Sequence, residues 1–248
     1  MENLLITLAF SGTRYHGFQV QKNALSVCEV FQNAVEAVYG TRYDVKGCSR
    51  TDAGVHANMY CLSMKADLHI PPEKLVLALN QKLPDDIAAL SVKNMPDDFH
   101  ARYSCRQKQY VYQIHNSAVK DPFAERLKYR HAYPLDAAML GHEAGDFLGT
   151  HDFTSFCSVK SDVGDTVRTV SECGVTRQGD TVSITVTADG FLYNMARIMA
   201  GTLLFIAAGK IERGAIPAII AARDRNRAGK TMPPHGLYLN RVDYGDSL

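Results

Sequence analysis

The chain has 248 residues, of which 46% are hydrophobic and 21% are charged, and its 27 Lys and Arg nearly balance its 26 Asp and Glu. This composition excludes a disordered chain and indicates a globular protein large enough to bury a substantial core. No apolar run is long enough to span a membrane, no signal-peptide pattern opens the chain, and the six cysteines form no C-x-x-C pair, so we expect a cytoplasmic protein without membrane contact or a zinc ribbon.

Residues 1–98 are predicted to form an N-terminal half with elements in the order β-α-β-β-α-β. Apolar residues alternate with polar or small ones in the first segment, and they recur with helical spacing before Gly40. The expected elements are a strand over 4–10, a helix over 26–39, strands over 43–45 and 59–64, a helix over 71–82 and a strand over 85–94. This order is that of a ferredoxin-like or RRM-like unit.

Residues 99–248 are predicted to form a C-terminal half, which begins after the boundary Pro96-Asp97-Asp98 and repeats the same order with insertions. The expected elements are a strand over 109–115, a helix over 135–148, a hairpin of strands over 166–177 and 181–188, helices over 191–208 and 216–223, and a strand over 237–242. We therefore predict an α/β fold of the α+β type. Its two halves are expected to join through a mixed, largely antiparallel sheet and to leave a cleft across the middle.

Residues 47–57 are predicted to be a tight connection between two strands, and they bring a guanidinium, a hydroxyl, a carboxylate and an imidazole close together. An Asp before Ala-Gly is also typical of a turn in which the carboxylate caps backbone N–H groups. The segment Arg50-Thr51-Asp52-Ala53-Gly54-Val55-His56-Ala57 resembles the active-site loop of the tRNA pseudouridine synthase A family. This resemblance implies that Asp52 is the catalytic nucleophile and that Arg50 helps to extrude the target base.

Two further segments resemble parts of the same family that surround the target base. Phe99-His100-Ala101-Arg102 precedes Tyr110-Val111-Tyr112, and the resemblance implies that Tyr110 stacks on the base. The two tyrosines also fit one face of a strand, so we expect at least one of them in the core. The segment 190–197 ends at Arg197, which by resemblance pairs with Asp52 and keeps that carboxylate ionised. An Arg on an apolar helix otherwise needs another partner or must reach solvent.

The resemblance also includes segments 149–156 and 227–239. In the first, His151 and Asp152 are adjacent on a predicted loop, which favours a structural role over a catalytic triad. In the second, Leu237 matches the apolar residue that packs against the uracil ring. The chain departs from the family pattern at Ser49 and over 58–64, and these departures leave details of substrate contact open.

Basic residues gather in two stretches despite the near-neutral net charge. These residues are Arg102, Arg106, Lys108, Lys120, Arg126, Lys128 and Arg130 in the first stretch, and Arg223, Arg225, Arg227 and Lys230 in the second. Such clusters are often solvated surface. With the resemblance beside them, we expect them partly to line a central basic cleft, with Arg102, Arg225 and Arg227 among the substrate-binding residues.

The resemblance implies a pseudouridine synthase fold, usually as a homodimer, that isomerises uridine to pseudouridine at positions 38, 39 and 40 of the tRNA anticodon stem-loop. The base is flipped out, the glycosidic bond breaks, the uracil rotates, and C5 bonds to C1′ of the ribose. Asp52 could attack C1′, attack C6 or deprotonate C2′, and the sequence does not choose among these steps. The exchange of one bond for another implies no metal, redox cofactor or ATP.

Two alternative functions use the same residues. A non-catalytic RNA-binding or chaperone protein would need the cleft alone, although retention of Asp52, Tyr110 and Arg197 together argues against it. A hydrolase could use Asp52 with His56, but no second carboxylate for the usual pair is evident nearby in the sequence.

Overall fold

The computed structural model describes residues 1–67, 70–158 and 164–245, and these residues form two compact units. Unit 1 comprises Met1–Arg106 and the C-terminal segment from Leu239, and unit 2 comprises Gln107–Tyr238. Within each unit, helices and strands are both present and most strand pairs are antiparallel, so the predicted α+β class is confirmed. None of the helices among the described residues is long and apolar enough to cross a membrane.

The strands of unit 1 are β1 (Glu2–Phe10), β2 (Val45–Gly47), β3 (His56–Ala66), β4 (Ile87–Met95) and most of β10 (Leu237–Asp243). Their order is β4-β1-β3-β10, and β2 pairs with residues 62–64 in the C-terminal half of β3. Strand β1 is antiparallel to both of its neighbours, and its apolar side chains are buried along almost its whole length. Because both faces of β1 are buried over 3–8, the polar residues of its alternating pattern, Asn3 and Thr7, are buried as well.

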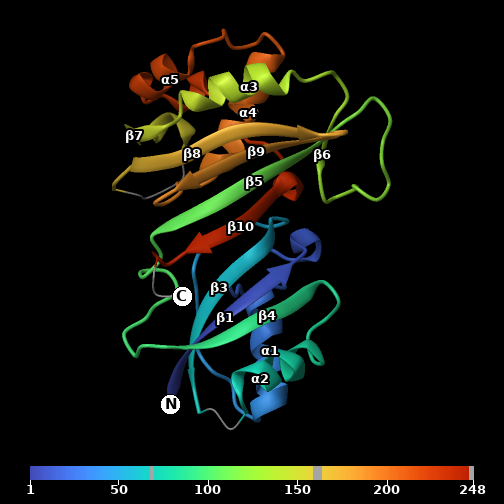
Figure 1. Cartoon of the computed structure of the whole chain (residues 1–248), viewed down its shortest axis with the longest axis vertical. Coiled ribbons are helices and arrows are strands. Elements are labelled where there is room, and N and C mark those ends of the chain that lie inside the picture. The colour runs from blue at the N-terminus through green and yellow to red at the C-terminus, as the bar shows by residue number, and fades with distance from the viewer. Residues whose placement is uncertain (68–69, 159–163, 246–248) are drawn as a thin grey trace. The chain divides into compact units, whose positions relative to one another are not determined.

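Two helices cover one side of this sheet, α1 (Val27–Tyr39) and α2 (Pro72–Asn80), as Figure 1 shows. Helix α1 begins at Ser26, whose side chain accepts a hydrogen bond from the Glu29 N–H, and it ends at Gly40, which has a φ of 69°. Both helices were predicted by the sequence and are confirmed, because capping residues and a periodic apolar face are local signals.

Residues 99–106 and 239–245 belong to unit 1, whereas the division drawn from the sequence placed them in the C-terminal half. The first segment is bound to unit 1 by hydrogen bonds from Asn3 Nδ2 to the Phe99 carbonyl, at 2.9 Å, and from the Ala101 N–H to Ser63 Oγ, at 3.2 Å. The second segment lies beside β3 and carries Tyr244, whose ring packs edge-on against Phe99. These contacts join residues far apart in the chain. The local composition at Pro96-Asp97-Asp98, on which the predicted boundary rested, therefore could not indicate them.

The strands of unit 2 are β5 (Gln107–Asn116), β6 (Tyr129–His131), β7 (Gly149–Asp152), β8 (Val167–Gln178) and β9 (Thr181–Ala188). Their order is β5-β9-β8-β7, all antiparallel, and β6 adds a parallel pair on β5. The predicted hairpin over 166–188 is confirmed as β8 and β9. The short strands β6 and β7 were not predicted, because three or four residues carry too little periodic signal.

Three helices of unit 2 lie together in Figure 1, α3 (Ala137–Gly145), α4 (Met195–Ala207) and α5 (Ile216–Ala222). Helix α3 packs on β8 and on α4, which is buried almost all round. The predicted helix over 191–208 begins four residues later than expected, because Asn194 at its N-cap has a left-handed φ of 64°. Short 3-10 turns η2 (Thr154–Phe156), η3 (Arg225–Arg227) and η4 (Pro234–Gly236) connect the remaining segments.

Candidate active site

The predicted catalytic carboxylate lies in a tight loop of unit 1 that connects β2 to β3. The Val55 N–H donates to the Asp52 carbonyl at 3.2 Å, and Gly54 has a φ of 77°, so the chain reverses at once after Asp52. The Asp52 side chain is half-buried, and the Arg50 side chain two residues earlier is exposed. The loop thus presents a carboxylate and a guanidinium at one end of β3.

A second segment of unit 1, residues 12–18, is packed backbone to backbone against this loop. The Gly12 N–H donates to His56 Nδ1 at 3.0 Å, and the Gly54 N–H donates to the Tyr15 carbonyl at 3.1 Å. A Cβ on Gly12 would overlap the Val55 carbonyl, and one on Gly17, where φ is 83°, would overlap the Thr51 carbonyl. We refer to residues 12–18 as the clamp segment, because at Gly12 and Gly17 its backbone lies too close to the Asp52 loop to leave room for a Cβ.

The clamp segment is itself anchored to unit 1. Tyr15 Oη and Arg14 Nε both donate to the Asp86 carboxylate at 2.7 Å. Burial and the bond to Asp86 raise the pKa of Tyr15 to about 12, so its hydroxyl stays a donor at neutral pH. Phe18 stacks on the Tyr60 ring at 4.1 Å, and Tyr60 Oη donates to the Ser49 carbonyl. The Asp52 loop is therefore held on both sides by residues that are distant in sequence.

In unit 2, Arg197 lies on the first turn of α4 and is half-buried. Its Nε donates to the Met232 carbonyl and its Nη1 donates to Asn194 Oδ1, each at 2.6 Å. Two hydrogen bonds to different atoms fix the plane of the guanidinium, and its other N–H groups can serve an anion. From the sequence, Arg197 was expected to have a partner or to reach solvent. The Met232 carbonyl and the Asn194 amide oxygen are among its partners.

Tyr110 and Tyr112 lie on the same face of β5. Tyr110 is 6% exposed, and its ring meets Phe191 edge-on at a centroid distance of 4.8 Å. Tyr112 is fully buried, its Oη donates to the Pro233 carbonyl at 2.9 Å, and burial raises its pKa well above the usual range. Tyr112 is thus the core residue that the sequence led us to expect. The contact from Phe191 was not singled out from the sequence, although this residue lies in the segment that ends at Arg197.

Leu237 begins β10 and is 6% exposed. It follows η4, a turn that contacts β5 within unit 2 and places Gly236 against the Tyr112 ring. A Cβ at Gly236 would crowd this ring, so the glycine is required for the close approach. The segment before Leu237 is therefore fixed to β5, the strand that carries Tyr110.

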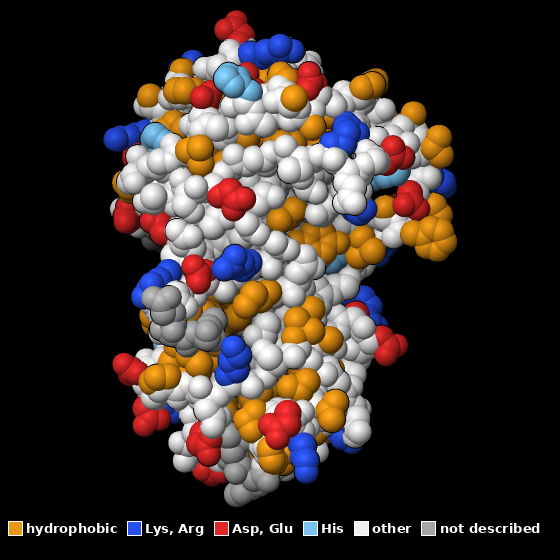
Figure 2. Space-filling model, viewed as in Figure 1, with side chains coloured by type: hydrophobic (Ala, Val, Ile, Leu, Met, Phe, Trp, Pro, Cys, Tyr) orange, Lys and Arg blue, Asp and Glu red, His pale blue; other side chains and the backbone are white. Residues whose placement is uncertain are grey.

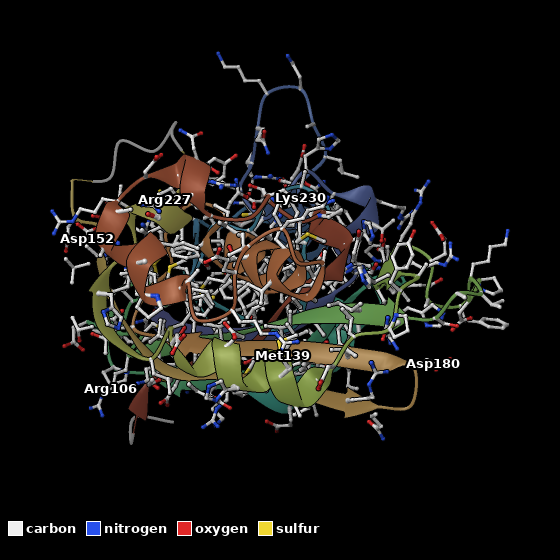
Figure 3. The ribbon with its side chains drawn as sticks, turned by 90° about the horizontal axis from the view of Figure 1, so that it is seen from above. Arg106, Met139, Asp152, Asp180, Arg227 and Lys230 are labelled. Carbon is white, nitrogen blue, oxygen red and sulfur yellow. The ribbon has the colours of Figure 1, made fainter. Side chains whose placement is uncertain are left out.

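The basic residues of unit 2 have different surroundings. Arg225 donates to the Gly229 carbonyl at 2.9 Å and to Thr231 Oγ1 at 3.2 Å, and burial lowers its pKa. Its guanidinium thus holds its own loop together, which the sequence did not reveal. Arg227 and Lys230 are exposed, and Figure 3 shows both on the side of unit 2 away from Met139 of α3. On the face seen in Figure 2, Lys and Arg are interspersed with Asp and Glu, so the basic cleft stays a prediction.

His151 and Asp152 have structural partners, as their adjacency in the sequence predicted. Asp152 accepts hydrogen bonds from the Thr154 hydroxyl at 2.6 Å and the Thr166 hydroxyl at 2.7 Å, and it pairs with Arg223 at 3.0 Å. Burial alone would raise the pKa of Asp152, but these bonds outweigh it and lower the pKa. The His151 ring lies 2.7 Å from the Leu148 carbonyl instead, so the two side chains do not form a dyad.

The comparisons with known proteins show the family of the chain. A family model described as tRNA pseudouridine synthase matches residues 6–104 and 144–245. The protein named tRNA pseudouridine synthase A from Thermoanaerobacter sp. (strain X514) is 42% identical over 244 residues, which span 98% of this chain and 100% of that protein. The protein of the same name from Ruminiclostridium cellulolyticum is 43% identical over 246 residues, with 98% and 100% coverage. The chain therefore belongs to the tRNA pseudouridine synthase family and is an isomerase.

Proposed function

We propose that this isomerase converts uridine to pseudouridine at positions 38, 39 and 40 of the tRNA anticodon stem-loop, with Asp52 as its nucleophile. In this reaction the N1–C1′ bond breaks and a C5–C1′ bond forms. The proton on C5 is released, and N1 gains a proton. No electrons are gained or lost overall, so no redox co-reactant is needed, and the solvent takes up the C5 proton and supplies the N1 proton.

The observation that carries the role of Asp52 is the rigid support of its loop. A nucleophile contributes most when its position is fixed before the substrate arrives. The Asp52 loop is supported by the buried bond from Gly12 to His56, by the bond from Gly54 to Tyr15, and by close backbone packing. Attack at C1′, attack at C6 and deprotonation at C2′ are all steps that such a carboxylate can perform.

Arg197 is proposed to pair with Asp52 and to keep it ionised, since an opposite charge nearby lowers the pKa of a carboxyl. The support within unit 2 is the guanidinium itself, which is half-buried and oriented by Met232 and Asn194. An oriented guanidinium can receive a carboxylate without further loss of side-chain freedom.

Tyr110 and Leu237 are proposed to receive the flipped uracil. A base taken out of its stack needs an aromatic or apolar surface in place of its former neighbours. The Tyr110 ring is supported by its edge-on contact with Phe191 and is proposed to stack on the base. Leu237 supplies an apolar side chain for the other contact with the base. Arg50, Arg102, Arg225 and Arg227 are proposed to contact the RNA, with Arg50 helping to extrude the base.

We also propose that the active form is a homodimer and that it acts in the cytoplasm. The first statement rests on the family resemblance, and the second on the lack of a membrane-spanning run or a signal-peptide pattern in the sequence.

The test is tritium release from tRNA labelled at C5 of uridine, followed in parallel with free uracil and tRNA binding. We expect the wild-type chain to release tritium without free uracil. Asp52→Asn keeps the side-chain shape but loses the nucleophile, so it should abolish release while leaving the Kd for tRNA within about tenfold, or roughly 1.4 kcal/mol. Asp97→Asn, the same change at an exposed residue of unit 1, is the control and should behave as wild type.

The other outcomes would support an alternative function or refute the role of Asp52. Free uracil would indicate a hydrolase, and binding without tritium release by the wild type would indicate an RNA-binding protein. Tritium release by a verified Asp52→Asn preparation would refute the role of Asp52. Arg197→Met, tested beside these variants, should lower activity far more than tRNA affinity.

A further inference from the structure

Unit 1 contains a groove of about 440 Å³ next to the Asp52 loop. Its walls include Lys46 and Arg50 on the side of the loop, and His100, Arg102 and Tyr103 on the side of the segment between β4 and β5. This volume is within the range of sites that bind small ligands. We refer to it as the Arg50–Tyr103 groove. Neither Asp52 nor Tyr110 lines it, whereas Arg50, which is proposed to help extrude the target base, does, so the groove adjoins the proposed uridine site without including the nucleophile.

The turn that carries Tyr103 is built by hydrogen bonds around His100. His100 Nδ1 accepts from the Arg102 N–H at 3.0 Å and lies 3.4 Å from the Tyr103 nitrogen. The Ser104 N–H donates to the His100 carbonyl at 2.9 Å, and the His100 N–H donates to Ser104 Oγ at 3.1 Å. These bonds close the turn and fix its backbone over residues 100–104.

Tyr103, on this turn, carries an exposed aromatic ring. The Tyr103 ring packs on the His100 ring at a centroid distance of 4.4 Å, and the Arg102 guanidinium lies 5.9 Å from its centre. The residue is nevertheless 78% exposed. A single exposed aromatic needs no explanation by itself. One that is supported from behind by an imidazole and lines a groove can accept a nucleobase by stacking.

The charges of the groove favour an anion. Lys46 is neutralised by Asp44, at 2.6 Å. Arg50 and Arg102 have no carboxylate partner among residues 1–67, 70–158 and 164–245. Two guanidinium groups that line one groove, with an aromatic ring next to Arg102, match the phosphates and the base of a nucleotide in single-stranded RNA.

We propose that the Arg50–Tyr103 groove binds a nucleotide that neighbours the target uridine in the same RNA strand, with its base on Tyr103 and its phosphates on Arg50 and Arg102. The proposal rests on the proposed function, because Asp52 marks where the target uridine lies. Arg50 is two residues from Asp52, so their Cα atoms are within roughly 8 Å. That span suits a nucleotide one or two steps along the strand. The groove would therefore contribute to the choice of site by holding an unstacked neighbour.

The experiment combines a protein change with a change in the RNA. Tyr103→Leu removes the ring and keeps an apolar side chain, Tyr103→Phe keeps the ring, and Tyr133→Leu makes the same loss at a tyrosine of unit 2 that is 76% exposed. Each protein is titrated with anticodon stem-loop RNA that carries an abasic nucleotide at one position on either side of the target. Stacking is worth about 1–3 kcal/mol per base, so we expect Tyr103→Leu to raise the Kd roughly tenfold. Tyr103→Phe and Tyr133→Leu should stay within about twofold of wild type.

The decisive result is the coupling between the two changes. At the position that occupies the groove, the abasic RNA should weaken wild type as much as Tyr103→Leu does, and should weaken Tyr103→Leu no further. Additive losses at every flanking position, or an unchanged Kd for Tyr103→Leu, would overturn the proposal. Uridine monophosphate serves as a separate probe. If it binds with a Tyr103-dependent affinity equal to that of the RNA, the groove is a site for free nucleotides and the proposal is wrong.

The binding readout separates this proposal from the proposed function. If the wild type binds the RNA but releases no tritium, the isomerase assignment fails while the coupling measurement still stands. If tritium is released and the coupling is absent, only the groove proposal fails.

Discussion

The backbone N–H of Gly12 donates a hydrogen bond to Nδ1 of His56 at 3.0 Å, and the His56 ring is fully buried. An imidazole nitrogen that accepts a hydrogen bond carries no proton, so His56 has its proton on Nε2 when this bond is made. The bond joins the clamp segment to the first residue of β3, immediately after the Asp52 loop. We therefore expect His56 to position the loop that carries Asp52.

We expect replacement of His56 to lower turnover more than substrate affinity. His56→Leu leaves the Gly12 N–H buried without its acceptor, which costs about 1–3 kcal/mol of stability. His56→Asn retains an acceptor oxygen and should recover part of both stability and kcat. Denaturant unfolding and steady-state kinetics with tRNA measure the two effects. If His56→Leu and His56→Asn lower the free energy of unfolding equally and leave kcat unchanged, the bond does not position Asp52.

Gly17 and Gly40 provide a matched test of the clamp segment, because both have a left-handed φ, of 83° and 69°. A Cβ on Gly17 would overlap the Thr51 carbonyl, whereas a Cβ on Gly40 would meet nothing within 4 Å. Gly40→Ala should therefore cost only the backbone strain of about 1–2 kcal/mol and leave the folded enzyme active. Gly17→Ala should displace the Asp52 loop and lower kcat strongly at a temperature where the protein is still folded. The reverse order of activities would refute the importance of this packing.

The surface charges of the second basic stretch predict a salt dependence. Arg225 is engaged by its own loop, whereas Arg227 and Lys230 are exposed on one side of unit 2. If both exposed residues contact phosphates, Arg227→Gln with Lys230→Gln should reduce the log–log slope of tRNA affinity against salt by about 2. Lys74→Gln with Lys82→Gln, two exposed residues in and just after α2, is the control pair. Salt titrations with identical slopes for wild type and the Arg227–Lys230 variant would place the RNA elsewhere.

Asp152 is predicted to stabilise unit 2 in a manner that depends on pH. Its pKa is lowered in the folded state, so the stabilisation is present above the ordinary pKa of an Asp and is lost as pH falls through the lowered value. Asp152→Asn should therefore unfold more easily than wild type at pH 7, and the difference should shrink in acid. Asp180→Asn, at the exposed turn between β8 and β9, is the control. Denaturant unfolding measured from pH 7 to pH 3 tests this, and a difference that grows in acid would contradict it.

The sequence by itself determined the features whose signals are local. Ser26 and Gly40 marked the ends of α1, alternation marked the long strands, and Gln178-Gly179-Asp180 marked the hairpin turn between β8 and β9. The segment 50–57 indicated the family, because an eight-residue match does not depend on how the rest of the chain folds.

Only the tertiary structure decided how these local elements are supported. The contact of Gly12 with Val55, the bond from Asn3 to Phe99 and the packing of Tyr244 on Phe99 all join residues separated by long stretches of chain. Two local features were also decided by the structure: α4 starts later than predicted, and Arg225 is hydrogen-bonded to its own loop. Both depend on backbone angles and carbonyl directions that residue types do not specify. Periodicity predicts which face of an element is apolar, but it does not predict which distant backbone atoms will contact that element. Contacts of this second kind, between the clamp segment and the Asp52 loop, fix the position of Asp52.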